Sequence, residues 1–513
     1  MKNILGRELP DYIEGYGKVN PFNGAYANLD VKEKKSVKIM SAIPGESKII
    51  ESIDEVLEKI GIQDGMCISF HHHLRNGDYV LNMVLEAVAK KGIKDITVAA
   101  SAIFPVHEPM VQYIKNGVVT GIYANYVSGP VADVISRGEL EKVVVMHTHG
   151  GRARAIESGD LHIDIAFIAA PTADIYGNIN GVSGKAACGA LGYAMPDAQY
   201  SDKVVAITDN LVQYPAVPIE ISQVYVDYVV NVDGIGDPAG IVSGTTKITK
   251  DPVGLKIAQN TAKVIEASGL LKDGISFQTG AGGVSLAVAA ELKDKMKEKN
   301  IIGSFAAGGV TGYIVEMLKE GLFKSIFDVQ CFDLKAVESY RDNANHQGMD
   351  ASMYGNPHNK GAVVNNLDVM ILGATEMDTQ FNTNVTTSSD GVIMGGSGGH
   401  SDTAAGSKLA IIVTKLVKSR LPIIKDEITT ITTPGETIDV VVTEMGIAVN
   451  PKRQDLLEKL SKTNLPIKSI EELKNIAEKM TGKPQKIETE KDIVAVIEYR
   501  DGTVIDIVKK VND

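Results

Sequence analysis

The sequence repeats itself, and this repeat constrains the fold more than any other feature. Residues 164–180 align without a gap on residues 368–384. Upstream, the stretch from Gly61 to Phe70 resembles the stretch from Leu270 to Phe277 at nearly the same spacing. Two matches in the same order predict two similar domains in tandem. We therefore expect an N-terminal arm over residues 1–45, a first domain over 46–245, and a second domain over 246–513 that includes a C-terminal extension.

Within each copy, strand patterns alternate with helix patterns. Residues 143–146 and 165–169 are continuously apolar, as strands buried on both faces are. A capping box, Ser52-x-x-Glu55, predicts the start of a helix. These patterns predict an α/β fold in which helices cover a mostly parallel sheet, with ligand sites beyond the carboxyl ends of the strands.

The tail of the chain has a different pattern. Residues 471–480 read as a polar helix, and two alternating apolar runs flank Asp501-Gly502, which is a strong hairpin signal. We expect this helix and hairpin to pack against the second domain.

Composition excludes several classes of function. The chain has 52 Lys and Arg against 64 Asp and Glu, a formal net charge of −12, which argues against binding DNA or RNA. Three cysteines, far apart in the sequence, supply neither a disulfide framework nor a zinc spacing. The first residues lack the apolar core of a secretory signal, and no apolar run approaches the length of a membrane span. We expect a cytoplasmic protein that holds no metal.

Three glycine-rich loops at predicted strand ends are candidates for ligand binding, over residues 279–285, 306–312 and 395–402. Clustered backbone N–H groups in such loops can hold a phosphate or an oxyanion, although each loop could equally be a tight strand-to-helix turn. The spacing matches neither a dinucleotide fingerprint nor a P-loop. The predicted cofactor-binding residues are Gly280, Gly282, Gly283, Gly308 and Gly309.

Histidine and arginine gather at two predicted strand ends, in residues 71–75 and 147–154. In an acidic chain these groups are the best places for a polycarboxylate to find positive partners. A single ring could instead only hydrogen-bond the backbone, and the spacing disfavours zinc. The predicted substrate-binding residues are His72, Arg75, His149, Arg152 and His400.

Carboxylates and amides recur in the repeat as Asp-x-x-x-Asn-x-Asn, beginning at Asp174 and Asp378. Such side chains brace turns by bonding neighbouring backbone groups, and a structural role is favoured for the first copy. Glu376 lies just before Asp378 of the second copy. Among the carboxylates of these repeated segments, it is the one that we expect could contact substrate.

Several separate segments form a recognisable set: Gly65–His72, His149–Arg152, Gly189–Ala194, Gln278–Gly280, Asp378–Asn382, Gly398–Thr403 and Gly446–Pro451. Together with others they resemble the corresponding segments of bacterial citrate lyase alpha subunits, from about residue 20 to the end of the chain. The resemblance implies the coenzyme A transferase fold, doubled in one chain. It also implies a citrate:acyl-carrier-protein transferase, which replaces acetyl by citrate on a thioester during citrate fermentation.

The same resemblance implies partners. The carrier would be the gamma subunit, whose dephospho-coenzyme A-type prosthetic group is a co-substrate, with acetyl-coenzyme A as a surrogate. A beta subunit would then cleave the citryl thioester. No cofactor would be bound covalently to this chain, which would form a homo-oligomer within the complex.

Many coenzyme A transferases form an enzyme thioester on a glutamate of the strand that follows the first glycine loop. Here that strand, residues 301–309, has no carboxylate. Our hypothesis is that a citrate carboxylate attacks the acetyl thioester directly and gives a mixed anhydride. The backbone amides of Gly398 and Gly399 would stabilise the oxyanion, and Glu376 is the fallback nucleophile.

Alternatives remain at this point. A free-standing coenzyme A transferase or acyl-coenzyme A hydrolase would use a glutamate, and a citramalate-specific enzyme would share the fold. A non-catalytic scaffold could bind citrate and display the carrier. A metal-dependent hydrolase is less favoured.

Overall fold

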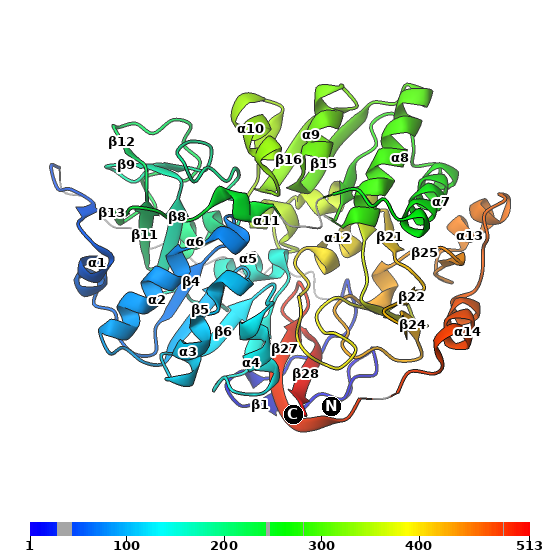
Figure 1. Ribbon diagram of the computed structural model, residues 1–513, viewed down its shortest axis with the longest axis horizontal. Coiled ribbons are helices and arrows are strands. Elements are labelled where there is room, and N and C mark those ends of the chain that lie inside the picture. Colours follow the sequence, from blue (N-terminus) through cyan, green and yellow to red (C-terminus); the bar gives the residue numbers. More distant parts are fainter. Residues whose placement is uncertain (28–43, 243–246, 281, 486, 513) are drawn as a thin grey trace.

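The computed structural model describes residues 1–27, 44–242, 247–280, 282–485 and 487–512. Two halves lie side by side, each built on a mostly parallel sheet with helices packed around it (Figure 1). This arrangement confirms the expected α/β class.

The sheet of the first half runs parallel throughout except at one edge. Its order is β28 (Val504–Val511), β27 (Thr489–Glu498), β7 (Val144–Met146), β6 (Val119–Ala124), β5 (Ile96–Ala100), β4 (Cys67–Phe70), β8 (Ile165–Ala170), β11 (Lys203–Thr208), β13 (Tyr228–Asn231) and β3 (Ile49–Ile50). Only β27 and β28 pair antiparallel. The central strands are buried on both faces, as their continuous apolar runs predict.

The sheet of the second half repeats this order. It runs β17 (His346–Gly348), β16 (Phe323–Cys331), β15 (Gly303–Val310), β14 (Phe277–Thr279), β18 (Val369–Leu372), β21 (Leu409–Val413), β25 (Val440–Thr443) and β26 (Gly446–Val449). In the first half β4 lies between β5 and β8, and in the second half β14 lies between β15 and β18 in the same way. In each half the chain therefore builds one side of the sheet first and then returns to the other side. The tandem duplication inferred from the sequence is therefore confirmed.

The repeated Asp-x-x-x-Asn segment forms the same turn in both halves. It joins β9 (Thr172–Asp174) to β10 (Ile179–Asn180), and β19 (Glu376–Asp378) to β20 (Thr383–Asn384). Asp174 Oδ1 accepts the N–H of Asn178 at 3.1 Å, and Asp378 Oδ1 accepts that of Asn382 at 2.9 Å. In each pair the Asn amide also donates to the Asp at 2.8 Å. These residues brace turns in both halves.

Helices follow the strands, and their starts agree with the sequence signals. The Ser52 side chain accepts the N–H of Glu55 and begins the first helix, as predicted. The helices of the first half are α1 (Ile53–Ile60), α2 (Val80–Lys90), α3 (Met110–Lys115), α4 (Pro130–Ser136), α5 (His149–Ser158) and α6 (Ala194–Tyr200). Those of the second half are α7 (Pro252–Ser268), α8 (Gly283–Lys299), α9 (Gly312–Lys319), α10 (Leu334–Asp342), α11 (Ala351–Gly355), α12 (His400–Gly406), α13 (Gln454–Ser461) and α14 (Ile470–Thr481).

The C-terminal hairpin lies between the two halves. It turns at Asp501-Gly502 as predicted, and β27 pairs in parallel with β7, with Val496 opposite Val145, so the hairpin adds two strands to the sheet of the first half. It also contacts the second half, where the Ile431 N–H donates to Asp506 at 2.8 Å. The predicted polar helix, α14, does pack on the second half, against β24 (Ile424–Lys425).

The N-terminal arm packs on this hairpin. Leu9, Ile13 and Val19 are buried in one cluster with Val496 and Val504. Residues 28–43 of the expected arm lie outside the described residues.

Candidate active site

Two loops that are far apart in the sequence meet where the halves join. The N–H of His149, at the start of α5, donates to the Gly398 carbonyl at 2.8 Å, and Thr148 forms a parallel bridge with Gly398. Behind them Asp402 of α12 accepts a hydrogen bond from Thr148 Oγ1 at 2.8 Å and another from the Gly150 N–H at 2.9 Å. We call this junction the seam. It consists of Thr148, His149 and Gly150 of the first half, Gly398, Gly399 and Asp402 of the second half, and the side chains packed around them.

Tyr193 lies against two of the predicted site histidines. Its ring centroid is 4.5 Å from that of His72 and 4.4 Å from that of His149. His72 Nδ1 is 2.5 Å from Ser101 Oγ, whereas His149 Nδ1 has no hydrogen-bond partner among the described residues. Burial lowers the pKa of His72 well below its ordinary value and that of His149 to about 3. With pKa values this low both rings are neutral at pH 7, so they would meet a substrate as hydrogen-bonding groups rather than as cations, and their role in substrate binding stays a prediction.

Arg75 supplies the positive charge. Its backbone is left-handed, with φ of 53°, and its guanidinium lies 4.7 Å from the ring centroid of Phe332 and 5.5 Å from that of Phe104. Nη1 is buried without a hydrogen-bond partner, and no carboxylate among the described residues forms an ion pair with the group. Burial lowers the pKa of Arg75, but an arginine stays charged at neutral pH. A partly buried cation that has no carboxylate partner favours an anionic ligand.

Arg152 does not have this freedom. Nη1 and Nη2 donate to both carboxylate oxygens of Asp197 at 2.7 and 2.8 Å, and Nη2 also donates to the Ala99 carbonyl. Both side chains are buried. The charge of Arg152 is thus already compensated within the first half, and its role as a substrate anchor stays a prediction.

Gly308 and Gly309 make room for side chains. They form an irregularity in β15, where Gly308 has φ of 102°. A Cβ on Gly308 would lie 2.3 Å from Gln278 Nε2, and one on Gly309 would lie 2.2 Å from the Phe332 ring. These two glycines, predicted to bind cofactor, therefore let Gln278 and the ring beneath Arg75 pack closely.

The third glycine loop shows a difference between its two predicted oxyanion donors. The N–H of Gly398 donates to the Asn125 carbonyl at 3.2 Å, so it is occupied. The N–H of Gly399 finds no acceptor within the described part of the chain. A Cβ on Gly399 would lie 2.3 Å from the hydroxyl oxygen of Tyr354. Of the two amides, that of Gly399 is the one available to a ligand.

His400 is fully engaged by the protein. Its Nδ1 is 2.7 Å from Thr433 Oγ1, and its Nε2 is 2.9 Å from the Gly373 carbonyl. Burial lowers its pKa to about 4. Both ring nitrogens thus already have partners within the protein, and substrate binding by His400 stays a prediction.

The first glycine loop leads into the long helix α8. Gly282 is the residue before the helix, and a Cβ on Gly280 or Gly282 would meet other atoms only at ordinary contact distances. Gly283 is tighter, since its Cβ would lie 2.9 Å from the Lys247 carbonyl. An accessible start of a long helix is suited to an anionic group, so Gly280, Gly282 and Gly283 stay predicted binding residues.

Glu376 is buried and bound on both oxygens. Lys425 Nζ and Ser389 Oγ contact Oε1, while the Thr429 N–H and the Asn384 amide donate to Oε2. Burial alone would raise the pKa of Glu376, but the Lys425 ammonium and these donors hold it below its ordinary value. Both oxygens are thus already bound, which disfavours attack on a thioester, and the fallback role of Glu376 stays a prediction.

The sequence interpretation missed several residues of the seam. Gln278 donates to the Tyr354 hydroxyl at 2.7 Å, and Gln330 Nε2 donates to the His72 carbonyl at 2.7 Å. Gln278 and Tyr193 both stand within segments that carried the family resemblance, and this could have marked them. Tyr354 and Gln330 have no such signal.

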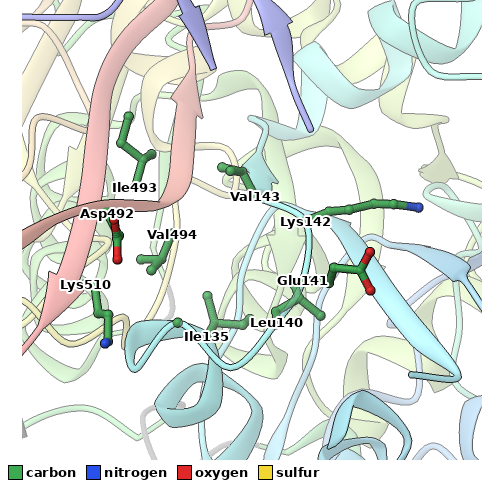
Figure 2. A pocket seen from close by; sticks show the side chains of 10 residues that line it. Ile135, Leu140, Glu141, Lys142, Val143, Asp492, Ile493, Val494 and Lys510 are labelled. Carbon is green, nitrogen blue, oxygen red and sulfur yellow. The ribbon is translucent and has the colours of Figure 1, made fainter. Parts of the chain in front are cut away.

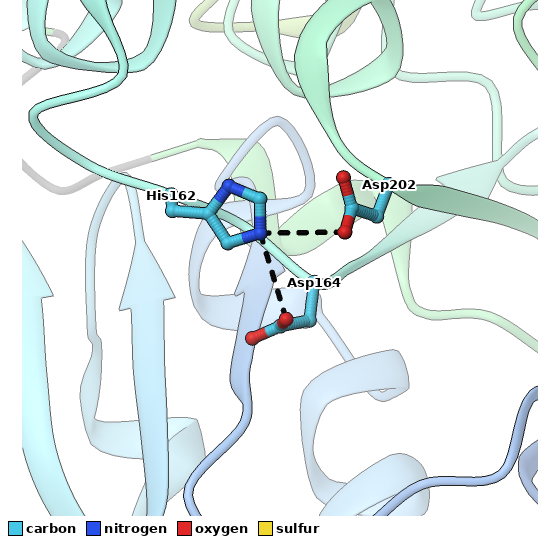
Figure 3. Close-up of side chains that lie close together, drawn as sticks. All are labelled: His162, Asp164 and Asp202. Carbon is cyan, nitrogen blue, oxygen red and sulfur yellow. Dashed lines mark ion pairs between the residues drawn. The ribbon is translucent and has the colours of Figure 1, made fainter. Parts of the chain in front are cut away.

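Two other features lie away from the seam. A cavity of about 220 Å³ opens between the loop after α4 and the C-terminal hairpin, lined by Val143, Ile493 and Lys510 among others (Figure 2). On the surface, His162 Nε2 lies 3.6 Å from Asp164 and 3.4 Å from Asp202 (Figure 3). Asp164 and Asp202 precede β8 and β11, so this group sits at the amino ends of the strands.

Comparison with known proteins agrees with this architecture and seam. The RipA structure from Yersinia pestis superposes with a TM-score of 0.60 at 17% identity, covering 84% of this chain and 97% of RipA. A Streptococcus mutans structure, described as an alpha subunit of citrate lyase in complex with citrate, has a TM-score of 0.96 at 49% identity and covers both chains completely. The citrate lyase alpha chain of Haemophilus influenzae is 49% identical over 474 residues, 92% of this chain and 95% of that one.

The fold and the seam define a doubled α/β protein of the coenzyme A transferase-like class. The family model "Citrate lyase, alpha subunit (CitF)" matches residues 46–511, and the chain belongs to this family. The resemblance found in the sequence is thereby confirmed, as is the expectation of an enzyme with the transferase activity of this subunit. None of the helices in the described residues has the length and apolar character to cross a bilayer.

Proposed function

We propose that the seam binds citrate beside an acetyl thioester and transfers the thioester from acetyl to citrate. The observation that supports this most directly is Arg75, a partly buried guanidinium whose Nη1 is buried and which has no carboxylate partner among the described residues. A tricarboxylate keeps two carboxylates in excess of the one that reacts, and Arg75 would hold one of them. The similar S. mutans structure is described as a complex with citrate.

The transfer would proceed without an enzyme nucleophile. A citrate carboxylate oxygen attacks the acetyl carbonyl, the C–S bond breaks, and the carrier leaves as a thiolate. The mixed anhydride then receives that thiolate at its citryl carbonyl, the C–O bond breaks, and acetate leaves. The supporting observations are that β15 carries no carboxylate and that both oxygens of Glu376 are already bound.

Each seam residue has a role in this scheme. The Gly399 N–H would donate to the oxyanion that forms at each carbonyl, a contribution typically worth on the order of 10²–10³ in rate. The neutral rings of His72 and His149 would hydrogen-bond citrate without adding charge. Burial of the seam would keep water from the anhydride.

The thioester would come from an acyl carrier. Its phosphate-bearing arm is a co-substrate, and the start of α8 at Gly280–Gly283 would take its anionic part. We propose the gamma subunit as this carrier and the beta subunit as the partner that cleaves the citryl thioester. We also propose that the complex contains several copies of this chain and works in the cytoplasm.

The deciding experiment supplies purified chain with acetyl-coenzyme A and either citrate or citramalate, and measures release of acetate and formation of the new thioester. Citrate is expected to react and the chain to need no added metal. Transfer to citramalate alone would overturn the substrate assignment. Hydrolysis of acetyl-coenzyme A without transfer would replace the proposal by a hydrolase, and binding of citrate without either reaction would replace it by a scaffold.

A further inference from the structure

The C-terminal hairpin reaches the seam through one buried ion pair. Asp402 is fully buried, and its carboxylate receives both hydrogen bonds described above from the first turn of α5. Arg500, in the segment between β27 and β28, places Nε 3.6 Å from Asp402 Oδ1. Its Nη2 donates to the carbonyl of Gly355, the last residue of α11, at 2.9 Å. Arg500 therefore touches two segments of the second half from a hairpin that belongs to the sheet of the first.

The surroundings leave these groups no room to move. A Cβ on Gly150 would lie 2.0 Å from the Gly355 carbonyl oxygen, and a Cβ on Gly355 would lie 3.1 Å from the Asp402 side chain. A Cβ on Gly151 would lie 3.3 Å from the Cα of Arg500. The start of α5, the end of α11, α12 and the hairpin turn are thus packed backbone to backbone around the ion pair.

We propose that Asp402 and Arg500 are positioning residues for the transfer reaction, which together hold the first turn of α5, and with it His149, against Gly398 and Gly399. This inference rests on the proposed function of the seam. Asp402 holds the turn by accepting hydrogen bonds from two of its donors, and Arg500 helps by keeping the buried carboxylate of Asp402 charged.

Electrostatics gives this arrangement a signature. The titratable groups that face Asp402 are Arg500 and Tyr499 of the hairpin, Tyr354 of α11 and Tyr193 before α6. Burial raises the pKa of all three tyrosines, so they stay neutral and Arg500 is the one cation among them. Burial also raises the pKa of Asp402 to about 6, and Arg500 opposes that rise. Removing Arg500 must therefore raise the pKa of Asp402 further.

The test compares Arg500→Gln, Arg500→Lys and Asp402→Asn with Arg7→Gln in the full chain. Arg7 is a matched control, because its Nε pairs with Asp506 of the same hairpin at 3.1 Å but does not touch α5. With acetyl-coenzyme A and citrate, Arg500→Gln should lower kcat by up to roughly 10²-fold with little change in the citrate KM, as small misplacements of reacting groups do. The acid limb of its kcat–pH profile should move to higher pH. Asp402→Asn should lose that acid limb. Arg7→Gln should change neither kcat nor the acid limb of the kcat–pH profile.

A second readout does not depend on the reaction. Amide hydrogen exchange of a peptide covering residues 147–152 should be faster in Arg500→Gln and Asp402→Asn than in the parent or in Arg7→Gln. Arg500→Lys keeps the positive charge and can be used if Arg500→Gln does not fold. It should keep the kcat–pH profile of the parent, while the amide hydrogen exchange of residues 147–152 should be moderately faster. Parent-like exchange and kcat in folded Arg500 variants would overturn the inference. Faster exchange in a chain that transfers nothing to citrate would keep the positioning role and refute the proposed function alone.

Discussion

The N–H of His149 donates to the carbonyl oxygen of Gly398 at 2.8 Å, and this bond joins the corresponding edges of two duplicated halves. Each half alone offers only one wall of the seam. Arg75, His72 and His149 come from the first half, and Phe332, Gln278 and Gly399 come from the second. Duplication within one chain thus places two strand-end surfaces face to face, which a reaction between two acyl groups requires.

Replacing Arg75 by glutamine should raise the KM for citrate at least tenfold and leave the KM for acetyl-coenzyme A nearly unchanged. The reason is that charged hydrogen bonds to a carboxylate are worth about 1.5–3 kcal/mol, while the thioester carries no charge at its reacting end. Steady-state kinetics with each substrate varied in turn will measure this. Arg75→Lys, which keeps the charge but not the planar fork, should lie between the two. An unchanged citrate KM in both variants would remove Arg75 from the citrate site.

Replacing Arg152 by glutamine should act on stability. The change leaves Asp197 as a buried, unpaired carboxylate, and breaking such a pair costs about 3–5 kcal/mol. The free energy of unfolding, measured by urea denaturation, checks this. Arg341→Gln is the control, because Arg341 and Asp342 form an exposed pair whose loss should cost roughly 0–1 kcal/mol. A citrate KM that rises in Arg152→Gln without loss of stability would restore Arg152 as an anchor.

These two arginines show what the sequence could and could not predict. The repeat predicted the doubled fold, because local contacts determine the structure of the repeated segments. Strands β8 and β18 and the turns that follow them depend on contacts within a few residues, so similar sequences form similar structures. Arg152 and Asp197 are 45 residues apart, and nothing local indicates that they pair. The same holds for Glu376 and Lys425, and for the pairing of β27 with β7 across most of the chain. Residue types indicated where charge could be, whereas tertiary packing decides which charges are already compensated.

Glu376 should not become acylated. Incubation with acetyl-coenzyme A followed by borohydride reduction converts a glutamyl thioester to an alcohol, and mass spectrometry of the peptide covering residues 369–384 should show only unmodified Glu376. The cause is that Lys425, Ser389 and Thr429 already occupy its oxygens. Asp378, two residues along in the same peptide, serves as an internal reference. Reduction confined to Glu376 would replace direct attack by a covalent route.

Acid should destabilise the protein from pH 6.5 downward. Burial lowers the pKa of five histidines, namely His71, His72, His73, His149 and His400. An unfolded histidine titrates near pH 6.5, so below that pH the unfolded chain binds more protons than the folded one, and the free energy of unfolding falls as pH falls. Glu220 and Asp402 act in the opposite direction, since burial raises their pKa values to about 7 and about 6, and their contribution is lost as pH rises through those values.

Burial also raises the pKa of Asp378, Asp439 and Asp506, which act with Glu220 and Asp402. Five histidines take up protons in the unfolded chain between pH 6.5 and 5, and this uptake decides the sign, so the free energy of unfolding measured in urea should be lower at pH 5 than at pH 6.5. His400→Gln should reduce this slope, because one of the five proton-binding groups is gone, and Glu220→Gln should steepen it, because an opposing group is gone. A free energy of unfolding that is flat or rises between pH 6.5 and 5 would mean that the seam histidines carry their protons in the folded protein, and the neutral rings assigned to citrate binding would then have to be treated as cations.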